Sequence, residues 1–388
     1  MFTISKCILR ETYIPFNVSF SHATFSRNHV KGIIVELHSS NGFSGYGEVL
    51  PRDYVSGETH ESVCYHLLNN IFPKMRGLKI ADYEELVAWI NNYYYTNSEL
   101  ETNETCAKTA VEIALLDLFS KSVGKSLLSC LGGNDNSLKN IEYSAIFSSG
   151  SEATYRQYYD AFSPFQFRQF KFKVGLNIQQ ELQMVARLRS DFGNDIQVRI
   201  DANGGWSFEE AAEYLPQFAD LGVVCCEQPL HHKERLFLPK LNKEFGEQIL
   251  LCADESLCTI DDAIWLAENK AVSVFNLRVS KNGGILDTLK LADIASKYGI
   301  SCQLGNQVGE TSILARAGQI VAALRGGFLF HEGAFGCMLL QNDVCSHSVQ
   351  FGHRGSYVVK DILSQPGLGI NVSDTKLDII TKEIHQVG

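Results

Sequence analysis

Lysines and acidic residues recur at nearly even intervals through the middle of the chain. Lys173, Asp201, Glu227, Asp254 and Lys281 each close, or closely follow, a short apolar stretch, and the intervals are 201 − 173 = 28, 227 − 201 = 26, 254 − 227 = 27 and 281 − 254 = 27 residues. One strand and one helix fill an interval of that length. The five charged groups are therefore predicted to lie at the carboxyl edge of parallel strands, where barrel enzymes carry out their chemistry.

The three acids of this set favour a hard cation. Asp201, Glu227 and Asp254 offer only oxygen atoms, and the set contains neither His nor Cys. Carboxylates brought together repel one another unless a cation lies between them. Three oxygen ligands that leave about three octahedral positions open suit Mg²⁺. The sequence therefore predicts a Mg²⁺ site, with Mn²⁺ as the alternative ion.

The lysines on either side favour proton transfer at a carbon next to a carboxylate. Lys171 and Lys173 alternate with Phe172, so both ammonium groups point to one face of their strand. A second ammonium and a metal ion lower the pKa of a neighbouring lysine, which lets it act as a base near neutral pH. Lys281, four strands further round, would address the opposite face of the same carbon. A metal bound to the carboxylate would stabilise the enolate that forms.

Alternating strands and helices from about Asn140 onwards must position these groups. Eight strand-like runs are expected at 142–147, 169–174, 196–201, 223–227, 249–253, 272–277, 299–304 and 327–331. Helical stretches separate them at 179–188, 207–217, 235–245, 261–267, 286–297 and 311–324. The alternation predicts an α/β protein with a parallel barrel of about 200 or more residues. An open doubly wound sheet is the alternative.

The first part of the chain follows a different pattern. Strand-like runs at 2–9, 32–38 and 44–49 precede helical stretches at 58–71, 83–94 and 103–120, the last with one apolar stripe. Strands followed by helices predict an α+β module. The Gly-rich segment 366–369 is expected to return the chain to this module.

Composition excludes several kinds of partner. The chain has 388 residues, a net charge of −10 and 11 cysteines. An acidic chain lacks the basic face that nucleic acids require. The sequence contains no uninterrupted run of about 18 apolar residues, so no membrane span is expected. The first ten residues do not show a basic region followed by a long apolar core, so no secretion signal is expected. Scattered cysteines without a CxxC pair predict reduced thiols in a cytoplasmic protein, and they lack the ligand spacing of a zinc site.

The motifs around the charged residues resemble the enolase superfamily and, within it, the muconate lactonizing enzyme subgroup. They are Phe-Lys-Phe-Lys-Val-Gly (170–175), Arg-Ile-Asp-Ala-Asn-Gly (199–204), Cys-Glu-Gln-Pro-Leu (226–230), Ala-Asp-Glu-Ser-Leu (253–257) and Asn-Leu-Arg-Val-Ser-Lys-Asn-Gly-Gly-Ile (276–285). The resemblance extends from residue 45 to near the C-terminus. It implies a (β/α)7β TIM-like barrel at 131–350 and an α+β capping domain formed by residues 1–130 and the tail, 351–388.

The same resemblance assigns roles to the charged residues. It implies that Asp201, Glu227 and Asp254 are the metal ligands. It also implies that Lys173 and Lys281 are the acid/base pair and that Lys171 tunes Lys173.

Features of the last barrel strands discriminate within the superfamily. The seventh strand offers no His for a mandelate racemase-type His–Asp pair, which leaves His331 as the one loose candidate and favours the lysine pair. Gly309-Glu-Thr-Ser312 resembles a turn of succinylbenzoate synthases and N-acylamino acid racemases, so Glu310 is expected beside the site. Dipeptide epimerases often carry an Asp-x-Asp after the eighth strand. Here only Glu332 is acidic at that place, and it is expected to lie near the substrate.

Further substrate-proximal candidates surround the five charges. Asn203 and Glu255 belong to the motifs at two strand ends. Arg27 and Arg52 lie in capping loops at 19–27 and 51–58 that are expected to close over the barrel mouth. Either arginine could pair with a second carboxylate of the substrate.

Three functions fit this pattern. Two opposed lysines favour Mg²⁺-dependent racemisation or epimerisation of an N-acylamino acid or a dipeptide. Elimination or cycloisomerisation, as in succinylbenzoate synthesis or muconate lactonisation, requires only one lysine to move a proton. A barrel that binds metal and ligand without turnover is the third hypothesis. The partner in each case is a small carboxylate, and the family likeness implies a homo-oligomer.

Overall fold

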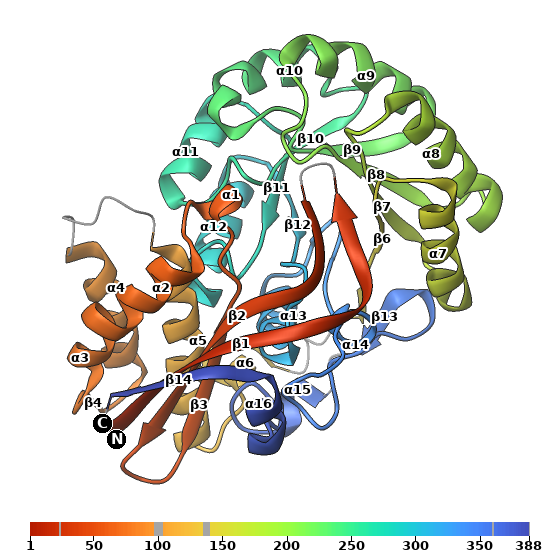
Figure 1. Cartoon of the computed structure of the whole chain (residues 1–388). Coiled ribbons are helices and arrows are strands. Elements are labelled where there is room, and N and C mark those ends of the chain that lie inside the picture. The colour runs from red at the N-terminus through yellow and green to blue at the C-terminus, as the bar shows by residue number, and fades with distance from the viewer. Residues whose placement is uncertain (23–24, 97–103, 135–139, 359–360, 388) are drawn as a thin grey trace.

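Two sheets of different construction organise the chain (Figure 1). The computed structural model describes residues 1–22, 25–96, 104–134, 140–358 and 361–387. Within these ranges only the backbone is described at 18–22, 25–27, 93–96, 358, 361 and 364.

The N-terminal sheet is antiparallel and has the order β14-β1-β2-β3, with β4 paired to β1. Its strands are β1 (Phe2–His22), β2 (Phe25–Ser39), β3 (Ser44–Val49), β4 (Lys79–Ile80) and β14 (Thr381–Val387). The strand predicted at 44–49 is confirmed, and those predicted at 2–9 and 32–38 extend further. Because β14 pairs with β1, the predicted return of the tail to this module is confirmed.

Helices cover this sheet. They are α1 (Asp53–Ser56), α2 (His60–His66), the π-helix η1 (Leu67–Ile71), α3 (Phe72–Met75), α4 (Tyr83–Thr96), α5 (Thr105–Ser122) and α6 (Leu127–Cys130). The helix predicted at 103–120 is confirmed as α5 within a few residues, and its burial extends beyond the apolar stripe: every residue from Cys106 to Ser120 is buried. The polar residues on its other side are paired across the module boundary. Lys108 forms an ion pair with Asp287, and Glu112 accepts a hydrogen bond from Leu286 N at 3.1 Å.

The second sheet is parallel and runs in strict chain order from β6 to β12. Its strands are β6 (Ala145–Phe147), β7 (Gln169–Lys173), β8 (Gln197–Asp201), β9 (Val223–Glu227), β10 (Leu250–Ala253), β11 (Val274–Leu277) and β12 (Ser301–Leu304). A doubly wound sheet reverses its strand order at a switch point. The uninterrupted order excludes that alternative and agrees with a barrel.

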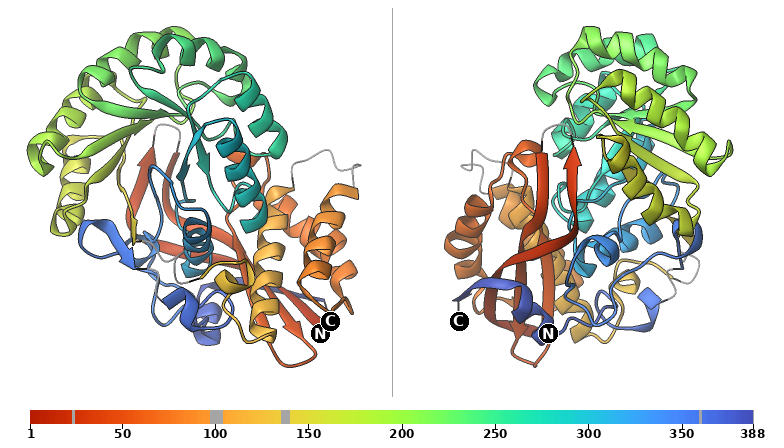
Figure 2. Two further views of the ribbon diagram at one scale, coloured as in Figure 1. Left: turned by 180° about the vertical axis from the view of Figure 1, so that it is seen from behind. Right: turned by 45° about the vertical axis from the view of Figure 1, so that its right-hand side comes forward.

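Helices between these strands form an arc outside the barrel (Figure 2). They are α7 (Glu152–Phe162), α8 (Ile178–Phe192), α9 (Phe208–Asp220), α10 (Leu238–Phe245), α11 (Ile260–Glu268), α12 (Ile285–Lys297) and α13 (Ser312–Arg325). The six predicted helices are confirmed within a few residues, whereas α7 was not predicted. The remaining elements are η3 (Ser163–Phe165), η4 (His232–Phe237), α14 (Gly336–Leu339), η5 (His353–Gly355), β5 (Asn140–Glu142), β13 (Ser356–Val358), α15 (Asp361–Ser364) and α16 (Asp374–Ile380).

Two strand predictions need correction. The run predicted at 142–147 divides, because β5 pairs with β13 and the barrel strand begins only at Ala145. The eighth strand predicted at 327–331 is reduced to bridges from His331 to Tyr143 and to Leu304. Gly326 and Gly327 both have positive φ, so the backbone is extended only after them. Backbone hydrogen bonds from Leu304 N to Phe330 O (2.9 Å) and from Ser144 N to His331 O (2.8 Å) still close the barrel.

The N-terminal module lies against the carboxyl edge of the barrel. Figure 2 shows the tips of β1 and β2 directed at the barrel. Glu48 of β3 accepts hydrogen bonds from Thr311 N (2.9 Å) and Leu314 N (3.1 Å), so a residue of one module caps the first turn of α13 in the other. The segment 51–58 contacts the segment after β10, since the Cys258 thiol donates to Val55 O at 3.3 Å.

Two further observations concern the whole described chain. Within the ranges given above, no helix combines the length and apolar character required to cross a bilayer. All eleven cysteines lie in these ranges and are free thiols.

The close packing of β3 on α5 generates a stability prediction. A Cβ at Gly47 would overlap the backbone of Ala110 and Ala114 on α5. We expect Gly47→Ala to lower the free energy of unfolding by about 2–3 kcal/mol, because backbone atoms must shift. Urea denaturation measures this change. Gly318→Ala in α13 is the control, since the nearest atom to a Cβ there is 3.8 Å away. Equal losses in both variants would contradict the prediction.

Candidate active site

The three predicted acids lie side by side at the carboxyl edge of the barrel. Asp201 ends β8, Glu227 ends β9 as its register partner, and Asp254 directly follows β10. All three are 0% exposed. The strand ends therefore bring together side chains that are 26 and 27 residues apart in sequence, as predicted.

The predicted lysines flank this acid row. On one side, Lys173 Nζ of β7 lies 3.1 Å from Asp201 Oδ2, and Lys171 Nζ lies 3.3 Å from Glu227 Oε1. On the other side, Lys281 Nζ lies 3.0 Å from Asp254 Oδ1 and donates to Asp254 O at 2.7 Å. Four strand steps separate β7 from β11, which precedes Lys281. The amines of Lys173 and Lys281 therefore contact opposite ends of the acid row.

Arg278, which belongs to the motif at 276–285 but had no predicted role, lies inside the acid row. Arg278 Nη2 pairs with Asp254 and lies 3.3 Å from Glu227 Oε1. Burial by itself lowers the pKa of this guanidinium, but Asp254 and Glu227 outweigh it and raise the pKa. A permanent positive charge thus lies between two of the acids.

Glu227 is held by amide donors from the next strands. Asn276 Nδ2 donates to Oε1 at 3.0 Å, and Gln303 Nε2 donates to Oε2 at 2.5 Å. Burial raises the pKa of Glu227 to about 7, and the nearby carboxylates of Asp201 and Asp254 act in the same direction. Asp201 behaves differently: burial raises its pKa, but Lys173, Lys171 and Arg278 outweigh burial and lower it.

A second ionic group lies deeper in the barrel. Glu332 pairs with Arg199 and lies 2.7 Å from Lys171 Nζ. These three side chains are at most 4% exposed. Burial raises the pKa of Glu332, but Lys171 and Arg199 together lower it. Glu332 is thus engaged by two cations of this chain, which differs from its expected place beside the substrate.

Asn203 and Glu255 lie beside the acid row as predicted. Asn203 Oδ1 accepts a hydrogen bond from Lys173 Nζ at 2.7 Å, and Asn203 has a left-handed φ of 47°. Its Nδ2 donates to Glu255 Oε1 at 3.4 Å. The other oxygen of Glu255 is buried without a hydrogen-bond partner among the described residues. Burial and the neighbouring Asp254 and Asp201 raise the pKa of Glu255 to about 8.

Glu310 lies at the wall of an apolar cavity of about 140 Å³. Burial raises its pKa to about 8, and Gln307 N donates to its Oε1 at 2.5 Å. Apolar side chains line the cavity, among them Ile146, Tyr158, Phe162, Val308, Met338 and Leu339. Because Ile146 and Val308 adjoin the carboxyl ends of β6 and β12, the cavity opens at the same edge of the barrel as the acid row.

The remaining candidates are placed less centrally. Arg52 is buried and donates to Pro51 O (2.9 Å) and Val308 O (3.2 Å), which ties the segment 51–58 to the barrel. The segment 19–27, predicted as a loop, belongs to the ends of β1 and β2 where its backbone is described, and its side chains, that of Arg27 included, lie outside the described side chains. Burial, followed by the nearby Arg199, lowers the pKa of His331 to about 4, so it is neutral at physiological pH.

Strand alternation could have identified the residues that were missed. Arg199 precedes Asp201 by two positions and Asn276 precedes Arg278 by two, so the members of each pair share a face of the chain. The same rule had placed Lys171 with Lys173. Gln303 has no comparable signal, because its neighbours on β12 are not charged.

The donor set of the acid row fits a divalent hard cation. Asp201, Glu227 and Asp254 supply oxygen atoms only, and the buried oxygen of Glu255 beside them has no hydrogen-bond partner in the part of the chain that the structure describes. Two of these acids already share one cationic group, Arg278 Nη2. The interior between them thus stabilises positive charge, as a Mg²⁺ site requires.

The deeper ionic group generates a stability prediction. Glu332→Gln removes the negative charge between Lys171 and Arg199, and a broken buried pair costs about 3–5 kcal/mol of unfolding free energy. Urea denaturation measures this loss. The control is Glu152→Gln, whose 62% exposed side chain pairs with Arg187 and should cost at most about 1 kcal/mol. Similar losses in the two variants would show that Glu332 is not an essential counter-charge.

Comparison with known proteins identifies the family. Residues 5–132 match the model "Mandelate racemase / muconate lactonizing enzyme, N-terminal domain", and residues 152–376 match "Enolase C-terminal domain-like". L-Ala-D/L-Glu epimerase of Clostridium acetobutylicum is 28% identical over 370 residues, which is 95% of this chain and 98% of that protein. N-succinyl-L-Arg/Lys racemase of Bacillus cereus is 26% identical over 377 residues, 95% of this chain and 94% of that protein.

A solved structure agrees over the whole chain. The dipeptide epimerase of Cytophaga hutchinsonii, complexed with Mg and the dipeptide D-Ala-L-Val, has a TM-score of 0.86 and 25% identity, and the match covers 100% of both chains. The barrel with its capping domain, the two family models and these relatives agree. The chain belongs to the enolase superfamily, in the muconate lactonizing enzyme subgroup of the mandelate racemase/muconate lactonizing enzyme family.

Proposed function

We propose that this protein is a Mg²⁺-dependent isomerase that removes a proton α to a carboxylate and returns it on the other face. The substrate is an N-acylated amino acid or a dipeptide. The observation that carries the proposal is the placement of Lys173 and Lys281 at opposite ends of one buried acid row. Two bases on opposite faces of a carbon are what inversion of configuration requires.

Asp201, Glu227 and Asp254 would hold the Mg²⁺. Members of the enolase superfamily bind Mg²⁺, and the related dipeptide epimerase was solved with it. When bound, the ion would stabilise the negative charge that develops on the substrate carboxylate. Mn²⁺, which has similar ligand preferences, is the expected alternative ion.

The lysines would move the proton. Lys173 would take it from one face while Asn203 and Asp201 hold its amine, and Lys281 would deliver a proton to the other face from its position on Asp254. Lys171 stays charged, because the carboxylates of Glu227, Glu332 and Asp201 outweigh burial and raise its pKa. A fixed positive charge therefore lies two residues from Lys173 on the same strand.

The apolar cavity beside Glu310 is the proposed pocket for the substrate side chain. Its lining includes residues next to the carboxyl ends of β6 and β12, at the barrel edge that also carries the acid row. The curated relatives act on small carboxylates: an L-Ala-D/L-Glu dipeptide and N-succinyl-Arg/Lys. An apolar lining favours substrates with an aliphatic or aromatic side chain at the position that enters it.

Several expectations from the sequence remain predictions. Arg27 and Arg52 remain candidates for a second substrate carboxylate, and a cytoplasmic location and a homo-oligomer remain expected. The domain boundaries at 130 and 350 likewise stay predictions.

Isotope exchange tests the two-base mechanism. The protein is incubated in D₂O with Mg²⁺ and mixtures of L,L-dipeptides and N-succinyl amino acids, followed by mass spectrometry and chiral separation. We expect deuterium at one α-carbon, with inversion. Lys173→Ala and Lys281→Ala should each slow inversion by about 10³-fold or more, whereas Lys297→Ala, at an exposed helix end, should not.

The outcomes separate the alternatives. Inversion at the wild-type rate in either lysine variant would refute the two-base mechanism. Loss of water or ring closure in place of inversion would indicate a dehydratase or cycloisomerase. Complete absence of exchange with every substrate class, despite Mg²⁺ binding, would favour a binding protein without turnover.

The raised pKa of Glu227 predicts how Mg²⁺ affinity depends on pH. Mg²⁺ binds the ionised carboxylate, so acidification through a pKa of about 7 protonates Glu227 and weakens binding. We expect the apparent affinity to fall about tenfold from pH 8 to pH 6, measured by titration calorimetry. Glu310→Gln, which removes a buried acid outside the row, should keep this dependence. A flat profile in the wild type would exclude Glu227 as a ligand with this pKa.

A further inference from the structure

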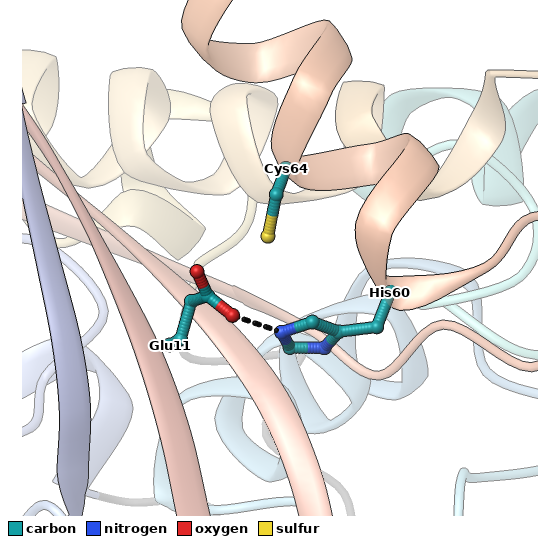
Figure 3. A group of neighbouring side chains, drawn as sticks. All are labelled: Glu11, His60 and Cys64. Atoms are coloured by element: carbon teal, nitrogen blue, oxygen red, sulfur yellow. Dashed lines mark hydrogen bonds and ion pairs between the residues drawn. The ribbon is translucent and has the colours of Figure 1, made fainter.

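A cluster of metal-ligating residue types lies in the capping domain, away from the barrel site. Figure 3 shows Glu11, His60 and Cys64 directed at one another. One ligand atom of each, a carboxylate oxygen, an imidazole nitrogen and the sulfur, lies within 4.8 Å of the other two. His60 Nε2 and Glu11 Oε2 are 2.8 Å apart.

The fold brings these residues together from two elements. His60 and Cys64 are four residues apart on α2, so they share one face of the helix. Glu11 lies on β1, and the register between β1 and β14 shifts between Glu11 and Thr12, with the extra residue on β14.

The cluster is largely shielded from solvent. Cys64 is 8% exposed, and the His60 side chain is 15% exposed. The second ring nitrogen of His60, Nδ1, is buried without a hydrogen-bond partner among the described residues. Because Nε2 is the nitrogen that faces Glu11, it is the ring atom that a metal ion in the cluster would bind.

We infer that Glu11, His60 and Cys64 form a Zn²⁺ site that joins α2 to β1. A mixed nitrogen, sulfur and oxygen donor set suits Zn²⁺, whereas the all-oxygen acid row suits Mg²⁺. A carboxylate and a thiolate balance the charge of the ion, and the thiol proton passes to solvent on binding. Ligand atoms of a tetrahedral zinc are about 3.4 Å apart, so the present separations need to change by little more than 1 Å.

His385 of β14 is a positioning residue for this site. Its Nε2 lies 2.8 Å from Glu11 Oε1, the carboxylate oxygen that faces away from His60. A hydrogen bond to the free oxygen of a ligating carboxylate orients that ligand and strengthens metal binding. The fourth coordination position would be left for water.

Cobalt substitution tests the site without reference to catalysis. The full chain is stripped with a chelator and titrated with Co²⁺ in excess Mg²⁺, which occupies all-oxygen sites. We expect a thiolate-to-Co²⁺ charge-transfer band in the near ultraviolet that saturates at one ion per chain and disappears when Zn²⁺ is added. No sulfur belongs to the acid row, so this band reports the capping-domain site alone.

Matched variants assign the ligands. Cys64→Ser should abolish the band, while Cys130→Ser, which replaces a half-buried thiol outside the cluster, should keep it. His60→Gln should weaken Zn²⁺ binding at least tenfold, and His385→Gln about 10- to 100-fold with the band retained. No band in the wild type, or an unchanged band in Cys64→Ser, would overturn the proposal.

A second measurement covers the case in which Cys64→Ser fails to fold. In the wild-type protein, Zn²⁺ should slow alkylation of Cys64 at least tenfold and leave alkylation of Cys130 unchanged, as mapped by peptide mass spectrometry. Equal alkylation of Cys64 with and without Zn²⁺ would also overturn the proposal. Both measurements are independent of the isomerase proposal, because neither uses a substrate.

Discussion

The burial of three carboxylates at one edge of a barrel is the constraint on which the rest of the structure depends. Asp201, Glu227 and Asp254 are completely buried, and a buried charge without a partner is strongly destabilising. The chain compensates with cations from the strands on either side: Lys171 and Lys173 of β7, and Arg278 and Lys281 after β11. The charges proposed to act in catalysis are therefore also the charges that make the acid row tolerable in the folded state.

The capping domain completes this arrangement through polar contacts. Glu48 of β3 accepts hydrogen bonds at the start of α13, and Lys108 of α5 pairs with Asp287 of α12. Burial raises the pKa of Glu48 to about 7 despite these hydrogen bonds, so the contact between modules carries its own electrostatic cost. Burial against the barrel thus raises the pKa of a carboxyl group in the cap, as burial does for Glu227 in the candidate active site.

Much of the candidate site could be predicted because the barrel repeats. The interval of about 27 residues equals one strand–helix unit, and a parallel barrel brings the ends of all such units to one edge. The positions of Lys173, Asp201, Glu227, Asp254 and Lys281 follow from that rule alone. Strand alternation, which placed Lys171 with Lys173, also predicts that Arg199 shares a face with Asp201 and that Arg278 shares a face with Asn276. Glu332 pairs with Lys171 and Arg199, and this pairing depends on the depth of the barrel interior, which residue spacing does not reveal.

The fold class, the family and the identity of the acid row could be read from the amino-acid sequence, because they depend on local periodicity and on contiguous motifs. That residues 327–331 form bridges and not a strand follows from the folded chain, because closure of a barrel depends on how the first and last segments meet. The burial of Cys106 to Ser120 on all sides of α5 likewise follows from the folded chain, because both modules pack against this helix. The folded chain alone brings Glu11 of β1 beside His60 and Cys64 of α2. Glu11 lies 49 residues before His60, so no local motif contains all three residues. Packing of the sheet against the helix, which acts between distant parts of the chain, brings them together.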